Sequence, residues 1–435
     1  MIINPLNKNE IDTVNEEKSI YFNREKVINE IIEYILEKHS NMLNEISFNE
    51  KNKEIIENII KERLSINYSQ IDTKEIFKDI IDRFFGYYIL QKYIDNTEVS
   101  DIRVIDYKTI FIKINGNWIK TGESFLDEKE YLNFVRYCIL KNGGKINNEI
   151  PIVVVSDKKN NLRIEAGIEP VNVISPNLVI RIHRPENFKN LEDLLTSQSY
   201  MFDYQIYIFL IKCMIAGVNI VISGKGASGK TTLLRGLINK IPNNVAITSN
   251  EETAELFCRH ENLIQREIIQ NRTKEKNISL EMLSKQCLVM SNDAIIIGEL
   301  KGQETMMFLD AISTGHRGYA TVHSNSSFNT VNRLITLMKR DKNAKDYSPK
   351  YLEQILANSI DIIIYMKNFK IQEITEIGYD YEKDQIIYNP IVKFNIEKII
   401  ENRSIGYYSK MNELKFIAKE KIDLSTFEIN KIMEG

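Results

Sequence analysis

The segment formed by residues 218–232 constrains the fold of this chain more than any other. It reads Val-Asn-Ile-Val-Ile-Ser-Gly-Lys-Gly-Ala-Ser-Gly-Lys-Thr-Thr, an apolar run followed by a glycine-rich loop. We expect a buried strand over 218–223, a loop over 224–229 and a helix over 230–239. Alternating strands and helices of this kind build an α/β fold with a parallel sheet.

The loop has the spacing Gly-x-x-x-x-Gly-Lys-Thr of a phosphate-binding loop. Glycines let backbone N–H groups approach phosphate oxygens without a Cβ clash, and the helix N-terminus adds partial positive charge. Lys230 would reach the β- and γ-phosphates, and the Thr231 hydroxyl would ligate Mg²⁺. The residues expected to bind the nucleotide are Gly224, Lys225, Gly226, Ala227, Ser228, Gly229, Lys230, Thr231 and Thr232.

Composition narrows the class of protein. A length of 435 residues predicts two or three domains, and the net charge of −3 provides no global basic field, so no nucleic-acid partner is expected. The four cysteines form no C-x-x-C pair, which favours reduced core thiols in a cytosolic protein over a zinc or disulfide site. The apolar stretch 204–222 is interrupted by Lys212, Gly217 and Asn219, so it predicts a buried helix and strand instead of a membrane span.

Residues 1–95 are expected to form a helical bundle. Apolar residues recur at helical spacing, and Asp72 followed by Glu75 resembles a cap that opens a further helix through Phe84. A partner-binding face remains an alternative use of these stripes. The stripes consist of Ile28, Ile31, Ile32, Ile35, Leu36, Ile55, Ile56, Ile59, Ile60 and Leu64.

Residues 96–188 are expected to form an α+β domain with its connector. Ile110, Ile112 and Ile114 alternate with other residues, and Asn115-Gly116 then provides a hairpin turn. A helix should end near Gly143, and further strands are expected over 151–156, 162–168 and 178–183.

Residues 189–435 are expected to alternate strands and helices around the phosphate loop, with a C-terminal extension. We expect strands at 245–248, 293–299 and 319–323 near the loop. The tail should contain a helix at 351–358, strands at 362–366 and 371–377, and a closing helical stretch.

Four side chains are candidates for catalysis. Glu299 ends an apolar run after Gly298, where a carboxylate would orient or deprotonate the attacking water. Glu251 and Glu252 follow a strand, at the sheet edge where α/β folds bind ligands, and one of them could hold a Mg²⁺-bound water. His323 ends another strand and could sense the γ-phosphate, with a structural role as the alternative.

In order along the chain, these segments resemble the secretion-superfamily traffic ATPases, the motors of type II and type IV secretion and of pilus assembly. The resemblance rests on a Walker A segment (224–232), an acidic box (251–256), a Walker B segment (293–302) and a histidine box (314–325). The helical N-terminal region and the acidic-box wording resemble most the tight-adherence (Flp) pilus motors. The four-cysteine metal module that type II secretion and type IVa pilus extension motors usually carry is absent, and the conjugation-type type IV secretion ATPase stays open as a near neighbour.

The resemblance implies a RecA-like ATPase domain that uses ATP and Mg²⁺, in a homohexamer with nucleotide sites between the N-terminal and C-terminal domains. It also implies that Arg163 and Arg181, at matching strands, reach the phosphates. The partner would be an inner-membrane platform protein, with the motor in the cytoplasm at the inner face of the cell membrane. ATP hydrolysis would power assembly of a tight-adherence pilus or protein secretion.

The chain departs from this family's pattern at three places. Glu252 stands where aspartate is usual, Lys301 replaces an arginine after Walker B, and 288–293 lacks the usual arginines. These departures support a second hypothesis, a nucleotide-binding structural subunit with weak hydrolysis. A nucleic-acid motor and a small-molecule kinase are less favoured, because no basic stripe and no acceptor-site signature are present.

Overall fold

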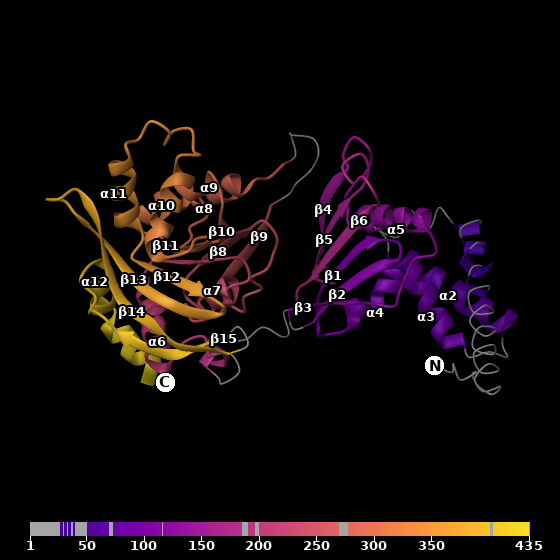
Figure 1. Cartoon of the computed structure of the whole chain (residues 1–435), viewed down its shortest axis with the longest axis horizontal. Coiled ribbons are helices and arrows are strands. Elements are labelled where there is room, and N and C mark those ends of the chain that lie inside the picture. Colours follow the sequence, from indigo (N-terminus) through magenta and orange to yellow (C-terminus); the bar gives the residue numbers. More distant parts are fainter. Residues whose placement is uncertain are drawn as a thin grey trace, which may run out of the picture. The chain divides into compact units, whose positions relative to one another are not determined.

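The structure is a computed structural model that describes residues 27–28, 30–32, 34–35, 38–39, 50–68, 73–114, 116–184, 190–195, 200–268, 277–400 and 403–434. The chain divides into two compact units, residues 1–184 and 185–435, and each contains its own sheet (Figure 1). Leu36, Asp72, Asn115 and most of the connector 186–198, which carry expectations from the sequence, lie outside the described residues.

The helices that open the first unit pack through their apolar stripes. Ile28, Ile31 and Ile35 are buried in one cluster with Ile56 and Ile60, as the helical spacing predicts. Their contact is therefore an internal core. The helical elements here are α2 (Glu50–Asn67), α3 (Thr73–Phe84), η2 (Tyr88–Leu90) and α4 (Gln91–Asp95).

An antiparallel sheet forms the rest of the first unit, in the order β3-β2-β1-β6-β5-β4. One face packs on α5 through residues such as Tyr131 and Val135, and buries Ile102, Ile164 and Ile180. Alternation places polar side chains such as Arg163 and Arg181 on the other face, together with exposed apolar ones such as Ile152 and Val154. The elements are β1 (Val99–Asp106), β2 (Thr109–Ile114), β3 (Asn117–Lys120), α5 (Glu128–Lys141), β4 (Ile152–Asp157), β5 (Leu162–Gly167) and β6 (Asn177–Ile182).

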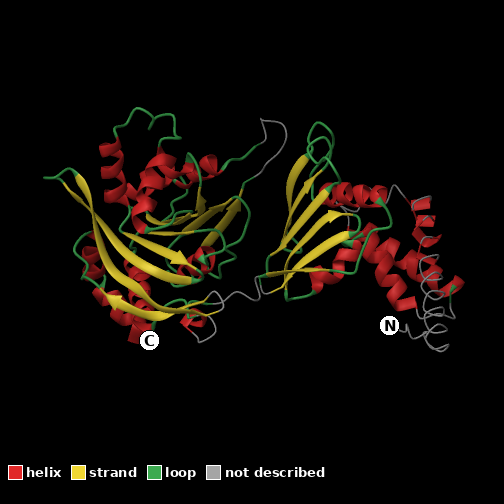
Figure 2. Cartoon of the chain, viewed as in Figure 1, coloured by secondary structure: helices red, strands yellow, loops and turns green. Residues whose placement is uncertain are grey.

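The second unit is built on a mixed sheet in the order β15-β14-β13-β12-β7-β11-β10-β8-β9. Strands β12 to β9 in this order are parallel, and β13, β14 and β15 extend the sheet in antiparallel fashion (Figure 2). The parallel part consists of β7 (Ile220–Gly224), β8 (Ile247–Glu251), β9 (Leu263–Glu267), β10 (Ala294–Leu300), β11 (Arg317–Val322) and β12 (Ile362–Lys367). The other elements are η4 (Glu192–Leu195), α6 (Tyr204–Ala216), α7 (Lys230–Ile238), α8 (Leu280–Cys287), α9 (Glu304–Ser313), α10 (Ser327–Met338), α11 (Pro349–Ser359), β13 (Lys370–Asp380), β14 (Gln385–Ile400), β15 (Arg403–Lys410), α12 (Ile417–Leu424) and α13 (Thr426–Glu434).

The two faces of this sheet bury two separate cores. Ile220 and Ile222 of β7 point into the core with α6 and α7, whereas Val221 points into the core with α9, α10 and α11. A strand covered on both faces needs apolar residues at every position, which explains the unbroken hydrophobic run before the phosphate loop. The expected α/β class with a phosphate loop at its centre is confirmed.

Three details differ from the sequence expectations. The strand after α7 runs over Ile247–Glu251, so Glu251 is its last residue instead of following it. The strand before the loop begins at Ile220, not at 218. The long hairpin β14–β15 was not expected; it contains Pro390, which is placed at an irregular register where Thr375 pairs with it. Proline in a strand argues against a strand assignment unless such an irregularity accommodates it.

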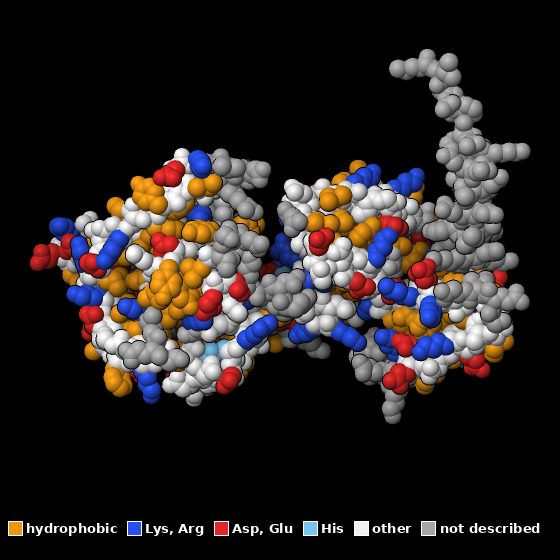
Figure 3. Space-filling model, turned by 90° about the horizontal axis from the view of Figure 1, so that it is seen from below, with side chains coloured by type: hydrophobic (Ala, Val, Ile, Leu, Met, Phe, Trp, Pro, Cys, Tyr) orange, Lys and Arg blue, Asp and Glu red, His pale blue; other side chains and the backbone are white. Residues whose placement is uncertain are grey.

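On the face in Figure 3, basic and acidic side chains are intermixed on each unit. Among the described residues no helix combines the length and apolarity that crossing a membrane requires.

Candidate nucleotide site

The loop between β7 and α7 has a backbone that depends on glycine. Gly229 has φ +95°, and a Cβ on Gly224 would lie 2.5 Å from the Met366 carbonyl oxygen. Lys225, Gly226 and Ala227 are exposed at the tip, while Gly224, Ser228 and Gly229 are buried. The loop is therefore a cradle of exposed backbone on a rigid base, the shape that phosphate oxygens require.

Lys230 begins α7 and is buried beneath the loop. Its Nζ donates a hydrogen bond to the carbonyl oxygen of Lys225, 2.9 Å away. Burial lowers the pKa of Lys230, and the nearby Glu299 charge opposes that effect. Thr231 and Thr232 follow on the first turn and are half-buried. The first N–H groups of a helix have no partner within the helix, so the start of α7 can donate to an anion.

The ends of three parallel strands meet beside this loop. Val322 at the end of β11 pairs with Ser223 of β7 and with Leu300 of β10, and Asn250 of β8 pairs with Ile297 of β10. Carboxyl ends of parallel strands form the ligand-binding edge of open α/β sheets. The candidates that follow these strands are consequently gathered at one edge with the phosphate loop.

Glu299 and His323 are in contact. The Nε2 atom of His323 lies 2.7 Å from Oε1 of Glu299. A Cβ on Gly226 would be 3.6 Å from Cε1 of His323, which locates the imidazole against the phosphate loop. Burial, and then the charge of Lys230, lower the pKa of His323, so a neutral imidazole is favoured at pH 7.

Glu252 and Glu299 are joined by Lys301. The Lys301 Nζ lies 2.6 Å from Oε2 of Glu252 and 3.1 Å from Oε2 of Glu299. Burial lowers the pKa of Lys301, but the hydrogen bond to Glu252 and the Glu299 charge together outweigh it and raise the pKa. Lys301 therefore carries its charge between two carboxylates. The sequence singled it out only as a departure from a family pattern.

Glu251 is the most buried of the three carboxylates, with 3% of its surface exposed. Its Oε2 accepts hydrogen bonds from the N–H groups of Glu255 (2.8 Å) and Leu256 (2.9 Å). Its Oε1 has no hydrogen-bond partner within the described part of the chain. Burial raises the pKa of Glu251 to about 7. Glu251 lies close to Gly298, since a Cβ there would be 2.9 Å from its Cγ.

The loop after β10 is held by two residues that the sequence reading did not single out. Oε1 of Glu304 accepts hydrogen bonds from the N–H groups of Lys301 (2.5 Å) and Gly302 (2.6 Å). Arg340 donates to the Lys301 carbonyl at 2.5 Å. The acid near the start of α9 is the signal that could have predicted the first contact, because such acids commonly cap the preceding turn.

Arg163 and Arg181 belong to the first unit, and the phosphate loop belongs to the second. They are direct neighbours across β5 and β6, on the polar face of their sheet. Nε of Arg181 lies 3.3 Å from Oδ1 of Asp101. Like charges placed opposite each other destabilise a sheet, and the Asp101 carboxylate provides a negative charge beside Arg181.

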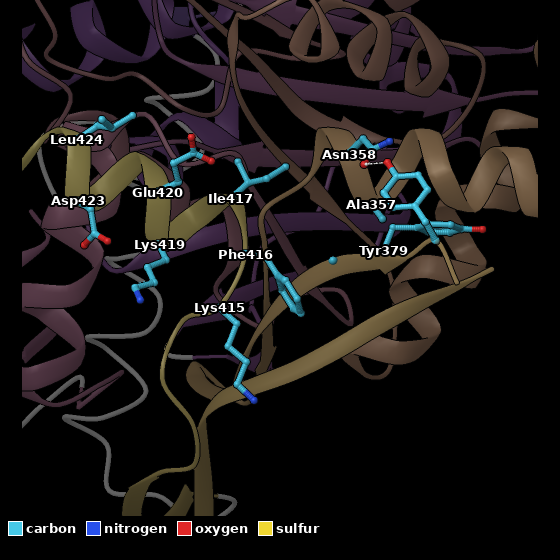
Figure 4. A pocket seen from close by; sticks show the side chains of 12 residues that line it. Ala357, Asn358, Tyr379, Lys415, Phe416, Ile417, Lys419, Glu420, Asp423 and Leu424 are labelled. Atoms are coloured by element: carbon cyan, nitrogen blue, oxygen red, sulfur yellow. Dashed lines mark hydrogen bonds between the residues drawn. The ribbon is translucent and has the colours of Figure 1, made fainter. Parts of the chain in front are cut away.

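The second unit also contains a cavity of about 670 Å³ away from the loop. In Figure 4, Phe416 and Ile417 lie between Lys419 and Glu420 of α12 and the side chains of Asn358 and Tyr379. None of the phosphate-loop residues lines it. Its lysines and carboxylates are mixed at the rim, which indicates no single charge class of ligand, so the loop remains the candidate site.

The residues present fit a nucleotide with Mg²⁺. No cluster of three or more histidine, cysteine or acidic side chains suited to hold a metal occurs in the described ranges. Mg²⁺ at phosphate sites usually keeps several waters and takes one or two protein ligands plus phosphate oxygens. The Thr231 hydroxyl and the neighbouring carboxylates meet that modest requirement.

Comparison with known proteins shows which protein family this chain is similar to. A family model described as "Type II/IV secretion system protein" matches residues 146–368, which run from before β4 to just past β12. The type IV secretion system protein VirB11 of Bartonella quintana is 30% identical over 182 residues, covering 41% of this chain and 51% of the relative. An uncharacterized protein of Methanocaldococcus jannaschii is 34% identical over 186 residues, covering 41% of this chain and 66% of the relative.

This chain spans about half the length of the curated VirB11 relatives that it matches. Among solved structures, that of the pilus retraction motor PilT with bound ADP aligns with a TM-score of 0.48 and 15% identity, over 80% of this chain and 88% of that one.

Proposed function

The chain belongs to the type II/IV secretion system protein family, and from this membership we propose that it is an ATPase that powers pilus assembly or protein secretion. The observation that carries the proposal is the contact of His323 with Glu299 beside the phosphate loop. A phosphate cradle alone indicates nucleotide binding. A carboxylate and an imidazole at its open edge add the groups that hydrolysis needs.

Different residues of the chain bind the phosphates, orient the attacking water and hold Mg²⁺ in the proposed reaction. Backbone N–H groups of the loop and Lys230 bind the phosphates of ATP. Glu299 orients the attacking water and accepts its proton, and the neutral His323 fixes the orientation of Glu299 while contacting the γ-phosphate side of the loop. When bound at Thr231, Mg²⁺ would offset negative charge on the phosphate oxygens. Glu251 and Glu252 would hold water at that position.

We further propose a homohexamer in which the first and second units enclose the nucleotide. Arg163 and Arg181 would then stabilise charge on the transferred phosphoryl group. The opposed position of the two arginines supports this assignment, because neighbouring guanidinium groups can contact one phosphate group together. An inner-membrane platform protein would read the resulting domain motion, with the motor at the cytoplasmic face of the membrane. Residues 1–95, 96–188 and 189–435 remain the proposed domain division.

The machine that the motor drives has two candidates. The acidic-box wording and the helical N-terminal region support a tight-adherence pilus motor. The curated relatives named as type IV secretion proteins support the conjugation-type alternative. Deleting the gene in its host distinguishes them: loss of surface filaments supports the pilus motor, and loss of substrate transfer with filaments intact supports the alternative.

A structural subunit with weak hydrolysis is the second candidate function. The observation that favours it is that both Glu299 oxygens lie beside cationic or imidazole groups, His323 on one side and Lys301 on the other. These contacts take up acceptor sites of the carboxylate that a water would otherwise use, which would slow hydrolysis. Turnover decides between the candidates.

The experiment measures Mg²⁺-dependent ATP turnover and oligomer mass for wild type, Lys230→Ala and Glu299→Gln. The control is Lys383→Ala, which removes an exposed ion pair with Asp380. We expect a hexamer whose turnover is lost in both site variants, with ATP binding retained in Glu299→Gln. A wild type that binds ATP but turns over no faster than Glu299→Gln would contradict the motor proposal.

A further inference from the structure

Lys301 connects two carboxylates that come from different strands. Glu252 directly follows β8, Glu299 lies near the end of β10, and the Lys301 Nζ is 2.6 Å from the first and 3.1 Å from the second. The proposed function uses both carboxylates and leaves Lys301 without a role. Its side chain is 44% exposed, so the contacts are not needed to satisfy a buried charge.

The backbone of Lys301 is held in place on both sides. Its N–H donates to Glu304, which is buried with 6% exposure, and its carbonyl accepts from Arg340. A side chain that starts from a fixed Cα reaches a limited set of positions. The fixed backbone limits where the ammonium can lie, and within that range it contacts both carboxylates.

The charges at this edge require a bridging cation. Glu252 and Glu299 would otherwise face each other with no cation between them, beside a loop that binds phosphates. Lys230, a second lysine near this edge, donates to the Lys225 carbonyl beneath the loop. Lys301 is consequently the cation that keeps both acids at the edge.

The two sequence departures noted above are partners in space. Glu252 has one methylene more than aspartate, and Lys301 is shorter than arginine and ends in a single ammonium. The longer acid and the shorter base meet, with Nζ of Lys301 2.6 Å from Oε2 of Glu252.

We propose that Lys301 is a positioning residue for ATP hydrolysis, which ties Glu299 to Glu252 and so holds the Glu299 carboxylate toward the phosphate loop. The inference rests on the proposed ATPase function. Lys301 acts through the two acids and touches neither substrate nor Mg²⁺. Its loss should therefore lower the rate of the chemical step and leave ATP binding intact.

The test compares Lys301→Met, Lys301→Gln and Lys301→Arg in the full-length protein by kcat, KM, ATP Kd and melting temperature. We expect kcat to fall about tenfold or more for Met and Gln, since misplacing a reacting group by a fraction of an ångström has effects of this size. KM and Kd should stay within about twofold. Arginine, which keeps the charge, should restore most of kcat. Lys383→Met, which removes an exposed ion pair elsewhere, is the matched control.

A double-mutant cycle separates positioning from general electrostatics. In a Glu252→Gln background, Lys301→Met should cost much less than in wild type, because the tie is already broken. Additive losses, or a kcat of Lys301→Met equal to that of wild type, overturn the inference while the ATPase proposal stands. A wild type without Mg²⁺-dependent turnover removes the ATPase proposal and this inference together.

Discussion

The Nε2 atom of His323 lies 2.7 Å from Oε1 of Glu299, where Glu299 is the last but one residue of β10 and His323 directly follows the neighbouring parallel strand β11. Burial, and then the charge of Lys230, lower the pKa of His323, so a neutral imidazole is favoured at pH 7 beside the Glu299 carboxylate. The contact orients the carboxylate without neutralising it. An orienting role of His323 can therefore be distinguished by mutation from a role as a positive charge.

We predict that His323→Gln retains more ATP turnover than His323→Ala. The glutamine amide can donate a hydrogen bond to Glu299, whereas alanine cannot orient the carboxylate. We expect kcat of His323→Ala to fall about 10- to 100-fold. Steady-state kinetics at saturating ATP measures kcat of wild type and both variants. His316, at the opposite end of β11, is the control, and its alanine variant should keep kcat. Equal losses in both His323 variants would contradict the orienting role.

Glu251 should make stability depend on pH. Burial raises its pKa from 4.5 to about 7, so between these values the folded protein holds a proton that the unfolded chain has released. The free energy of unfolding should fall as pH rises through this window, by about 3 kcal/mol in total. Glu251→Gln lacks this dependence. Urea unfolding of both proteins at pH 5 and pH 8 measures the difference, and a difference that does not change with pH would refute the assignment.

Replacing Gly224 by alanine should destabilise the protein much more than replacing Gly226 by alanine. A Cβ on Gly224 would lie 2.5 Å from a backbone carbonyl, whereas a Cβ on Gly226 meets nothing closer than 3.6 Å. We expect Gly224→Ala to destabilise by about 1–3 kcal/mol and Gly226→Ala by less than about 1 kcal/mol. Thermal unfolding of the two variants measures the difference in their melting temperatures. Equal melting temperatures would show that the loop moves to accommodate the methyl group.

The ion pair between Lys421 and Asp361 should hold α12 against the sheet. The Asp361 carboxylate is 2% exposed, lies 2.6 Å from Lys421 Nζ and accepts the Asn219 N–H. We expect Lys421→Met to cost about 2–4 kcal/mol, because it leaves a buried carboxylate without its cation. Asp361→Asn in the same background should recover part of the loss.

The control for that pair is Lys410→Met. Lys410 and Glu413 also form an ion pair, but their side chains are 61% and 79% exposed. An exposed pair contributes little, so the change should stay below about 1 kcal/mol. Urea unfolding of the two lysine variants tests the contrast, and similar losses would contradict it.

Arg163 and Arg181 should affect turnover more than stability. They stand directly opposite each other, so Arg163→Ala relieves repulsion and should not lower the melting temperature. If the arginines reach the phosphates of ATP, kcat should fall about 100-fold or more. Arg103→Ala, an exposed arginine of β1, is the control. Unchanged turnover in Arg163→Ala and Arg181→Ala would remove them from the site.

The sequence was sufficient to predict a structural feature where one contiguous segment contains all the residues that the feature needs. The phosphate loop depends on glycines and a lysine within a single stretch, so its strand, loop and helix could be predicted before any tertiary contact was known. The α/β class followed from the alternation of strand and helix patterns around this loop, and the apolar run 294–297 is typical of a strand covered on both faces. The hairpin β14–β15 could not be predicted, because Pro390 and many polar residues hide its alternation.

The identity of the candidate residues was thus determined by the sequence, and their combination was decided by the tertiary structure. Glu252, Glu299 and His323 each end or follow a different parallel strand, and only the order of those strands in the sheet brings them together. Lys301 acquires its two partners, and Glu251 its raised pKa, through packing between distant segments. The physical reason is that distances and burial depend on how strands pair, and a pattern along one chain contains neither.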